Sequence, residues 1–203
     1  MPKPWMPNLP RLILASASPA RLQLLRQIGL EPLVCPSGVD EGQFQNSDPV
    51  ALVATLAEAK ATNVATRFTP PAVVLGCDSL FELGGVIYGK PRDAATALAQ
   101  LQHLSGRQGQ LHTGHTLIDL TTGETLTRVA TTQVFFSRLT SEQMQAYIHT
   151  GEPLQCAGAF ALEGKGGIWV ERITGCHSNV IGLSLPLFRE MMSQLGYDLT
   201  QYW

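Results

Sequence analysis

The segment Ser16-Ala17-Ser18-Pro19-Ala20-Arg21 has the residue types needed to hold a phosphate group. Ser18 followed by Pro19 is typical of a helix start, with the serine as N-cap and the proline in the first turn. Free backbone N–H groups, hydroxyl donors and a forked guanidinium together form a phosphate cradle. An ordinary cap would explain Ser18 and Pro19 but not Ser16 or the position of Arg21, so we expect Ser16 and Arg21 to bind phosphate.

Carboxylates at two places could hold a metal ion. Asp78 follows the apolar run 72–77, which predicts a buried strand with Asp78 at its end, and Asp40-Glu41 lies in a polar, turn-rich loop. Mg²⁺ prefers a few oxygen ligands together with substrate phosphates, and one such acid can also order an attacking water. An isolated aspartate is otherwise a turn or helix cap, which is the alternative for Asp78.

Gly84 to Lys90 spells the front half of a P-loop, but the next residue is Pro91, where a P-loop needs a serine or threonine for Mg²⁺. Gly84-Gly85 also indicates a hairpin turn instead of a strand-to-helix loop. We therefore exclude a P-loop. The Gly89-Lys90-Pro91 turn still places an ammonium beside a predicted helix start, which suits an anion, although a solvated lysine would have the same sequence.

Other catalytic signatures are absent from the sequence. It has no G-x-S-x-G elbow and no H-E-x-x-H motif. His112 and His115 are better interpreted as strand residues than as zinc ligands. Cys77 lies in an apolar strand, so we interpret it as a small buried hydrophobe and not as a nucleophile.

The elements that must position these groups alternate between strands and helices. We expect strands at 12–15, 33–34, 72–77 and 168–173, a long hairpin of 110–120 with 124–136, and helices starting at Ser18, Asp48, Pro91, Ser141 (as a cap) and Leu185. The second helix, 49–67, carries Lys60. This order predicts an α/β protein with a mixed twisted sheet flanked by helices. We expect one domain over 11–203, after a short flexible leader at 1–10.

Composition narrows the class of partner. The 203 residues carry a formal net charge of −2, and a binder of duplex nucleic acid would be basic. No apolar run is long enough to span a membrane. The four cysteines are widely spaced, which favours reduced thiols and a cytoplasmic location.

The chain resembles the Maf family, once called septum-formation inhibitors, in an ordered series of short motifs: LILASASPARLQLL, VDE, LAEAKA, VLGCDS, GKP, LSG, TGHTL, CAGAFALEGKGG and NVIGLSLPL. The match extends from Arg11 to about Leu195. It implies hydrolysis of nucleoside triphosphates between the α- and β-phosphates, a divalent cation (Mg²⁺, with Mn²⁺ as a substitute), a two-lobed fold with a central cleft related to that of inosine triphosphatase, and a homodimer.

The resemblance also implies roles for individual residues. Asp78 and Glu41 correspond to catalytic acids and also to the metal ligands. Lys60 and Lys90 correspond to catalytic lysines that also bind phosphate, as Ser16 and Arg21 do. Ala20, Ser79 and Glu163 fall at positions that set base preference.

One of these positions departs from the pattern, because many relatives have an arginine where this chain has Ala20. An ionised Glu163 accepts hydrogen bonds and donates none, which suits the N–H edge of guanine and favours a purine or 7-methyl-GTP over dTTP and UTP. Ala20 offers no aromatic ring to stack on a methylated base, so the preferred base stays open. Two other functions remain open: a nucleotide-binding regulator of cell division with little turnover, and a hydrolase that releases inorganic phosphate.

Overall fold

The computed structural model describes residues 9–203, so nearly all of the predicted leader, residues 1–10, lies outside the described residues. The elements follow one another in this order: β1 (Arg11–Leu14), α1 (Pro19–Gln27), β2 (Leu33–Val34), η1 (Glu41–Gln43), α2 (Pro49–Ala65), β3 (Ala72–Leu83), β4 (Val86–Tyr88), α3 (Ala94–Leu104), β5 (Gln108–Asp119), β6 (Thr125–Phe136), α4 (Ser141–His149), η2 (Glu152–Gln155), η3 (Ala157–Ala159), η4 (Lys165–Trp169), β7 (Val170–Thr174), α5 (His177–Ile181), α6 (Leu185–Gln194) and η5 (Leu199–Tyr202).

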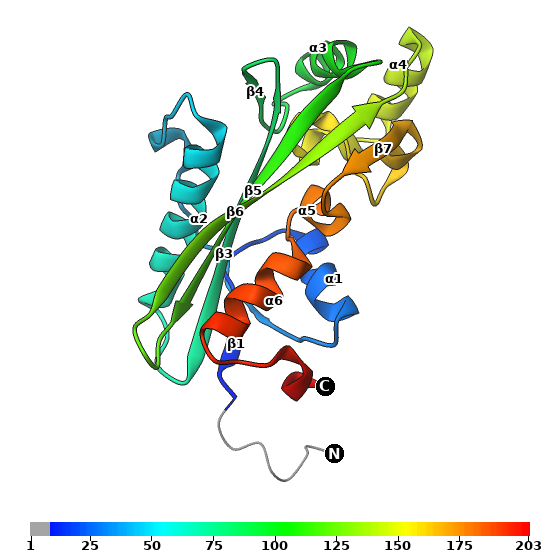
Figure 1. The fold of residues 1–203 in the computed structure, drawn as a ribbon. Helices are drawn as coiled ribbons and strands as arrows, with labels where there is room; N and C mark the ends of the chain where they lie inside the picture. The colour runs from blue at the N-terminus through cyan, green and yellow to red at the C-terminus, as the bar shows by residue number, and fades with distance from the viewer. Residues whose placement is uncertain (1–8) are drawn as a thin grey trace.

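The strands form one mixed sheet of seven strands in the order β2-β1-β3-β5-β6-β7, with β4 paired to β3. β1 is parallel to both β2 and β3, and the other pairs are antiparallel. Figure 1 shows α2 on one side of the twisted sheet and α1, α5 and α6 on the other. The predicted mixed α/β fold is confirmed.

β3 has an unpaired stretch in the middle of one edge. β1 pairs with residues 72–75 of β3, and β4 pairs with residues 81–83 on the same strand. The prediction that Asp78 ends a strand is wrong, because β3 continues to Leu83 along its antiparallel partner β5. Asp78 instead lies just beyond the parallel part of the sheet, in the stretch 76–80 that neither β1 nor β4 covers.

Two glycines allow α2 to lie unusually close to the sheet. A Cβ added at Gly76 on β3 would lie 2.3 Å from the carbonyl oxygen of Ala57, and one at Gly114 on β5 would lie 2.1 Å from that of Val53. Real Cβ atoms do not approach backbone atoms so closely, so only glycine fits at these positions. This contact brings the Lys60 side of α2 against the middle of β3.

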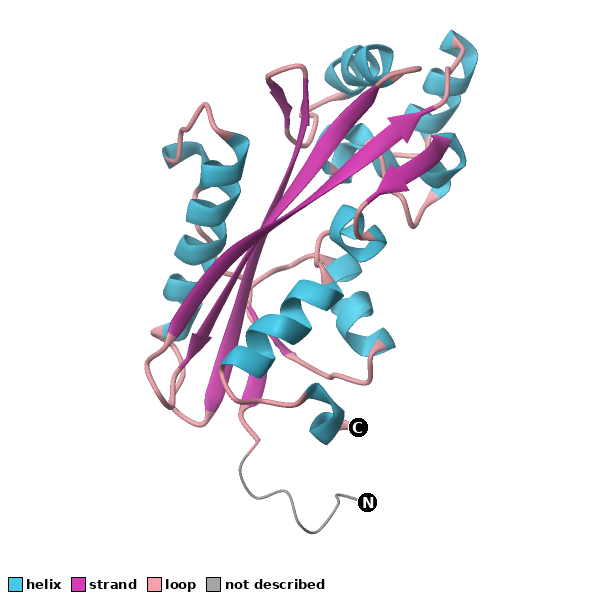
Figure 2. Cartoon of the chain, viewed as in Figure 1, coloured by secondary structure: helices cyan, strands magenta, loops and turns pink. Residues whose placement is uncertain are grey.

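Buried side chains gather at both ends of the long strands. One cluster joins β1, β3 and β5 to α1 and α6 and includes Leu75, Phe188 and Met191. A second cluster lies at the other end of β3, where the rings of Phe81, Phe136 and Phe160 meet edge to face. Because β3, β5 and β6 run through both ends (Figure 2), the lobes are joined by continuous strands and not by a linker.

Several predicted boundaries are wrong by one to three residues. The cap of α4 is Thr140 and not Ser141, because Thr140 and Gln143 form a reciprocal capping box. α3 begins at Ala94 instead of Pro91, since Asp93 caps it by accepting from the N–H of Thr96. β7 begins at Val170, after the 3-10 turn η4.

Other local predictions are confirmed, although α2 ends at Ala65 and not at residue 67. Ser18 caps α1 by accepting from the N–H of Arg21, and Gly84 and Gly85, both with positive φ, turn β3 into β4. All four cysteines are free thiols. Within residues 9–203, no helix is long and apolar enough to cross a membrane.

Candidate active site

The ammonium group of Lys60 joins two carboxylates from different parts of the chain. Its Nζ lies 2.5 Å from Oδ1 of Asp78 and 2.6 Å from Oε1 of Glu41. Lys60 and Asp78 are buried, while the Glu41 side chain is 58% exposed. α2 supplies the lysine, the unpaired stretch of β3 supplies Asp78, and the 3-10 turn η1 supplies Glu41. One ammonium group and two carboxylates therefore lie together beside the edge of β3.

Arg21 reaches the same edge from the other face of the sheet. Its Nε donates to the carbonyl oxygen of Gly182 at 2.8 Å, Nη1 donates to Oγ of Ser16 at 3.1 Å, and Nη2 donates to Oγ of Ser79 at 3.0 Å. A guanidinium has five N–H donors, so two remain for a ligand. These three hydrogen bonds fix the orientation of the Arg21 guanidinium before any ligand binds.

Lys90 lies at the rim and is exposed. Among residues 9–203, no carboxylate lies within ion-pair distance of it. Gln100 of α3 donates to the carbonyl oxygen of Gly89 at 3.3 Å and so holds the turn that presents Lys90. The expectation that a helix start assists Lys90 is wrong, because Asp93 already occupies the N-terminus of α3.

These groups line a cavity of about 320 Å³, within the range of small-molecule sites. Its wall includes nearly every residue singled out from the sequence: Ala20, Arg21, Glu41, Lys60, Asp78, Ser79, Lys90 and Glu163. A second cavity adjoins it and contains the turn from Ser16 to Pro19. Arg21, Glu41, Lys60 and Lys90 line both cavities.

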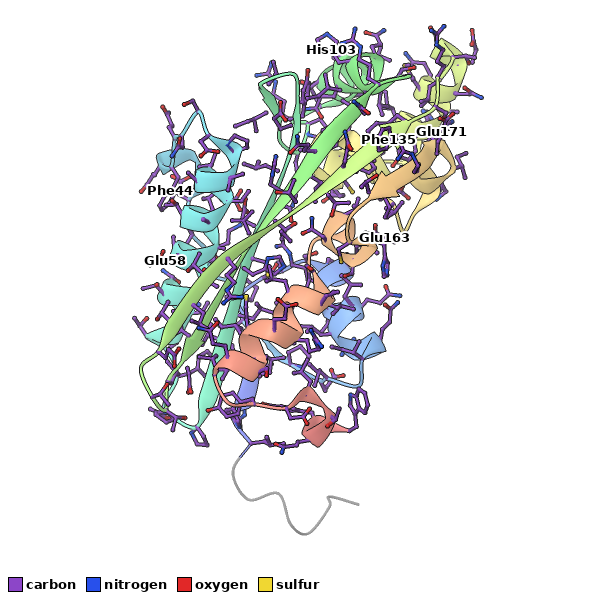
Figure 3. All side chains as sticks on the ribbon, in the orientation of Figure 1. Phe44, Glu58, His103, Phe135, Glu163 and Glu171 are labelled. Atoms are coloured by element: carbon purple, nitrogen blue, oxygen red, sulfur yellow. The ribbon has the colours of Figure 1, made fainter. Side chains whose placement is uncertain are left out.

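Part of the wall of the first cavity is apolar. Leu111, Phe160 and Val180 line it, and Ser79 and Glu163 line the same cavity with polar atoms. Figure 3 labels Glu163 on the side of the sheet where β7 and α5 lie. Partial loss of hydration against the cavity wall raises the pKa of the Glu163 carboxyl.

The loop that carries Glu163 is held by another glutamate. Glu152 accepts hydrogen bonds from the Tyr147 hydroxyl at 2.7 Å and from the backbone N–H groups of Lys165 at 3.1 Å and Gly166 at 3.0 Å. A Cβ at Gly164 would lie 2.5 Å from this carboxylate, so the loop closes tightly around it. Neither Glu152 nor Tyr147 could be identified from the sequence, because neither lies in a phosphate or metal pattern.

Burial affects the pKa of Asp78 in the cavity wall and of its neighbour Cys77 in the core. It raises the pKa of Asp78, an effect opposed by the nearby charges of Lys60 and Arg21. A carboxylate whose pKa is raised toward neutrality is a better proton acceptor. Burial also raises the pKa of the Cys77 thiol to about 11, so it stays protonated and is no nucleophile, as expected from its apolar strand.

The donors at this position fit a hard divalent cation. Asp78 and Glu41 both reach within 2.6 Å of the same nitrogen atom, so their oxygens are close enough to share one ion. Among residues 9–203, no group of three or more His, Cys, Asp or Glu side chains could hold a metal. Two carboxylates are still sufficient for Mg²⁺ when substrate phosphates and water supply the other ligands.

The fold and the site together define a class of protein. It is a mixed-sheet α/β protein whose cleft is rich in cationic side chains and so suits a polyanion. Residues 11–195 match the family model described as Maf-like protein. The chain therefore belongs to the Maf family.

Curated relatives cover almost the whole chain. A protein from Cyanothece sp. is 55% identical over 95% of this chain and 99% of its own length. Proteins from Synechococcus elongatus and Trichormus variabilis are 53% and 52% identical, and each is covered over 98% of its length. All three are named nucleoside triphosphate pyrophosphatase. A nucleoside-triphosphatase (dITP/XTP pyrophosphatase) structure from Mycobacterium abscessus is a distant match, with 17% identity and a TM-score of 0.40 over 71% of this chain and 97% of that one.

Proposed function

We propose that this protein is a nucleoside triphosphate pyrophosphatase, which hydrolyses the bond between the α- and β-phosphates and releases a nucleoside monophosphate and pyrophosphate. The observation that carries the proposal is the pair of adjoining cavities that share Arg21, Glu41, Lys60 and Lys90. One cavity has apolar walls suited to a base, and the other has the serine-rich turn suited to phosphates. A nucleotide that occupied both would place its phosphate chain across the shared cations.

Each side chain has a role in this arrangement that its position suits. Arg21, Lys60 and Lys90 neutralise the triphosphate and the charge that develops on the leaving pyrophosphate. Ser16 lies at the phosphate end with the turn of α1. Asp78, with its raised pKa, orients a water in line with the α-phosphorus and accepts its proton. Such chemistry depends mainly on positioning and charge.

Glu41 and Asp78 would hold the divalent cation, which would be Mg²⁺, with Mn²⁺ as a substitute. When bound, the ion supplies charge neutralisation at the phosphate oxygens. Lys60 now sits between the two carboxylates. Its flexible four-carbon stem would let the ammonium turn toward a phosphate while the carboxylates take up the cation.

Base preference is set by three residues that line the first cavity: Ala20, Ser79 and Glu163. Ala20 and Ser79 are too small to fill the cavity, and Glu163 brings a carboxylate to its rim. An ionised carboxylate accepts hydrogen bonds, so a guanine-type edge with N–H donors would suit it better than the carbonyl-rich edge of uracil or thymine. We therefore place purine nucleotides, including 7-methyl-GTP, ahead of dTTP and UTP.

A panel of nucleoside triphosphates, assayed for pyrophosphate with Mg²⁺ present, tests the proposal. We expect pyrophosphate from at least one purine nucleotide and none when EDTA replaces the metal. Tight nucleotide binding without turnover would favour a regulator of cell division instead, and release of inorganic phosphate would favour a different hydrolase.

The assembly and location remain predictions. We propose a homodimer in the cytoplasm, with no duplex nucleic acid as partner. Light scattering during size-exclusion chromatography gives the number of subunits, and a mass equal to one chain at micromolar concentration would contradict the dimer.

A further inference from the structure

A line of hydroxyl groups runs from the guanidinium of Arg21 into the core. Nη2 of Arg21 donates to Oγ of Ser79 at 3.0 Å, and Oγ of Ser79 lies 2.9 Å from Oγ1 of Thr113. Oγ1 of Thr113 in turn donates to the backbone carbonyl oxygen of Asn179 at 3.2 Å. Ser79 and Thr113 are direct cross-strand partners on β3 and β5. Of these four residues, Arg21 and Ser79 line the cavity, and Thr113 and Asn179 do not.

The chemistry of the two ends favours one direction for the hydrogens in this line. A carbonyl oxygen can only accept, so the 3.2 Å contact of Thr113 with Asn179, whose oxygen also accepts from the N–H of Gly182 at 3.0 Å, is a hydrogen bond when the single hydroxyl hydrogen of Thr113 points to it. Thr113 must then accept from Ser79, whose only hydroxyl hydrogen points away from the cavity. A guanidinium can only donate, so Ser79 also accepts from Arg21. Ser79 is left with lone-pair density, and no hydrogen, for a ligand.

Burial of Thr113 and a fixed position for the Asn179 carbonyl keep the hydroxyl hydrogens in these directions. Thr113 and Asn179 are both 0% exposed, so water cannot offer the Thr113 hydroxyl another partner. The two hydrogens of the Asn179 side-chain amide are shared among three acceptors, the carbonyl oxygens of Leu111 and Ala130, each at 3.2 Å, and Oγ1 of Thr132 at 3.0 Å. These bonds tie α5 to β5 and β6 and hold the accepting carbonyl in place.

We propose that Thr113 is a specificity-determining positioning residue, which keeps the Ser79 hydroxyl as an acceptor toward the substrate. Thr113 does not touch the ligand and acts through Ser79. A base that faces Ser79 must then present a hydrogen-bond donor. This inference rests on the proposed hydrolysis of nucleotides in the cavity that Ser79 lines.

Inosine triphosphate and ATP are matched probes for this property. Inosine has an N–H at ring position 1, and adenine has an accepting nitrogen at the same place, while the two purines have nearly the same size. An acceptor-only Ser79 favours the inosine nucleotide. Without the Thr113 hydroxyl, Ser79 can turn its hydrogen into the cavity and donate to adenine.

The test is the ratio of kcat/KM for inosine triphosphate to that for ATP, measured by pyrophosphate release. We expect the wild type to prefer inosine triphosphate and Thr113→Val to reduce this ratio by about five- to tenfold, the effect of one hydrogen bond. Thr113→Ser, which keeps a hydroxyl, should retain the wild-type ratio. In a double-mutant cycle, Thr113→Val should have no further effect on the ratio once Ser79→Ala is present.

Thr116→Val is the matched control, because Thr116 is also 0% exposed on β5 and pairs with Thr127 at 2.9 Å, away from the cavity. An unchanged ratio in Thr113→Val, or the same change in Thr116→Val, would overturn the inference. If Thr113→Val does not fold, Ser79→Ala must reduce the ratio and Thr113→Ser must keep it. Wild-type protein that releases no pyrophosphate from any nucleotide would instead refute the proposed function.

Discussion

The Lys60 ammonium donates a 2.5 Å hydrogen bond to Asp78, and both groups are buried beside the unpaired stretch of β3. The lysine comes from α2, which Gly76 allows to lie close to the strand. Burial raises the pKa of Asp78 while Lys60 lowers it. The reactivity of the aspartate therefore depends on the lysine and on the packing that brings the lysine there.

Replacing the Asp78 carboxylate with an amide tests its role as a proton acceptor. We expect Asp78→Asn to lower kcat by about 10²- to 10⁴-fold, the usual contribution of a positioned general base. The fold should persist, since Lys60 keeps its ion pair with Glu41. Circular dichroism checks the fold, and Asp198→Asn, at an exposed cap of η5, is a control that should leave turnover unchanged. Near wild-type turnover in Asp78→Asn would show that another group activates the water.

Removing the ammonium should move the pH dependence in a defined direction. Asp78 works as the ionised base, so activity falls as the pH drops through its pKa. Lys60 lowers that pKa, so Lys60→Met raises it and shifts the acid limb of the kcat profile to higher pH. Lys90→Met is the control, because Lys90 is not among the charges that act on Asp78. It should reduce turnover without moving the limb, and a limb at the same or lower pH in Lys60→Met would contradict the coupling.

The close approach of α2 can be tested at its two glycines. We expect Gly76→Ala and Gly114→Ala each to lower the free energy of unfolding by about 1–3 kcal/mol, the usual cost of overpacking. Gly76→Ala should reduce kcat/KM more strongly, because it would displace Ala57 and Ala61, on either side of Lys60. Urea denaturation and pyrophosphate release measure the two effects. If Gly76→Ala and Gly114→Ala lose the same activity at the same stability, the contact at Gly76 does not position the site.

Glu163 offers the plainest test of base preference. Its carboxylate accepts hydrogen bonds, whereas the amide of Glu163→Gln both accepts and donates. We expect this substitution to raise kcat/KM for dTTP and UTP relative to GTP, because the amide can donate to the pyrimidine carbonyls. The nucleotide panel measures the ranking of kcat/KM values. If Glu163→Gln leaves that ranking unchanged, hydrogen bonding between residue 163 and the base does not set the preference.

Local features could be predicted from the sequence because their causes are local. The Ser18 cap, the Gly84-Gly85 turn and the 125–136 arm of the hairpin all follow from residues within a few positions of one another. The apolar run before Asp78 indicated a strand but not its length, because β3 is extended by pairing with β5.

Long-range relationships could not be predicted in this way. Nothing in the spacing of Thr113 and Asn179 indicates that they share a hydrogen bond, since 66 residues separate them. Lys60 corresponds to a lysine of a family motif, but its position between two acids depends on how α2 packs. Glu152 acts through backbone N–H groups of a distant loop, which leave no trace in residue type.

Above all, we propose that Asp78 directs water to the α-phosphorus of a nucleotide whose phosphates lie across Arg21, Lys60 and Lys90. Hydrolysis in water enriched in ¹⁸O, followed by ³¹P NMR and mass spectrometry of the products, tests it most directly. We expect one pyrophosphate for each monophosphate, with the ¹⁸O in the monophosphate. Label in the pyrophosphate, or products consisting of diphosphate and inorganic phosphate, would contradict it.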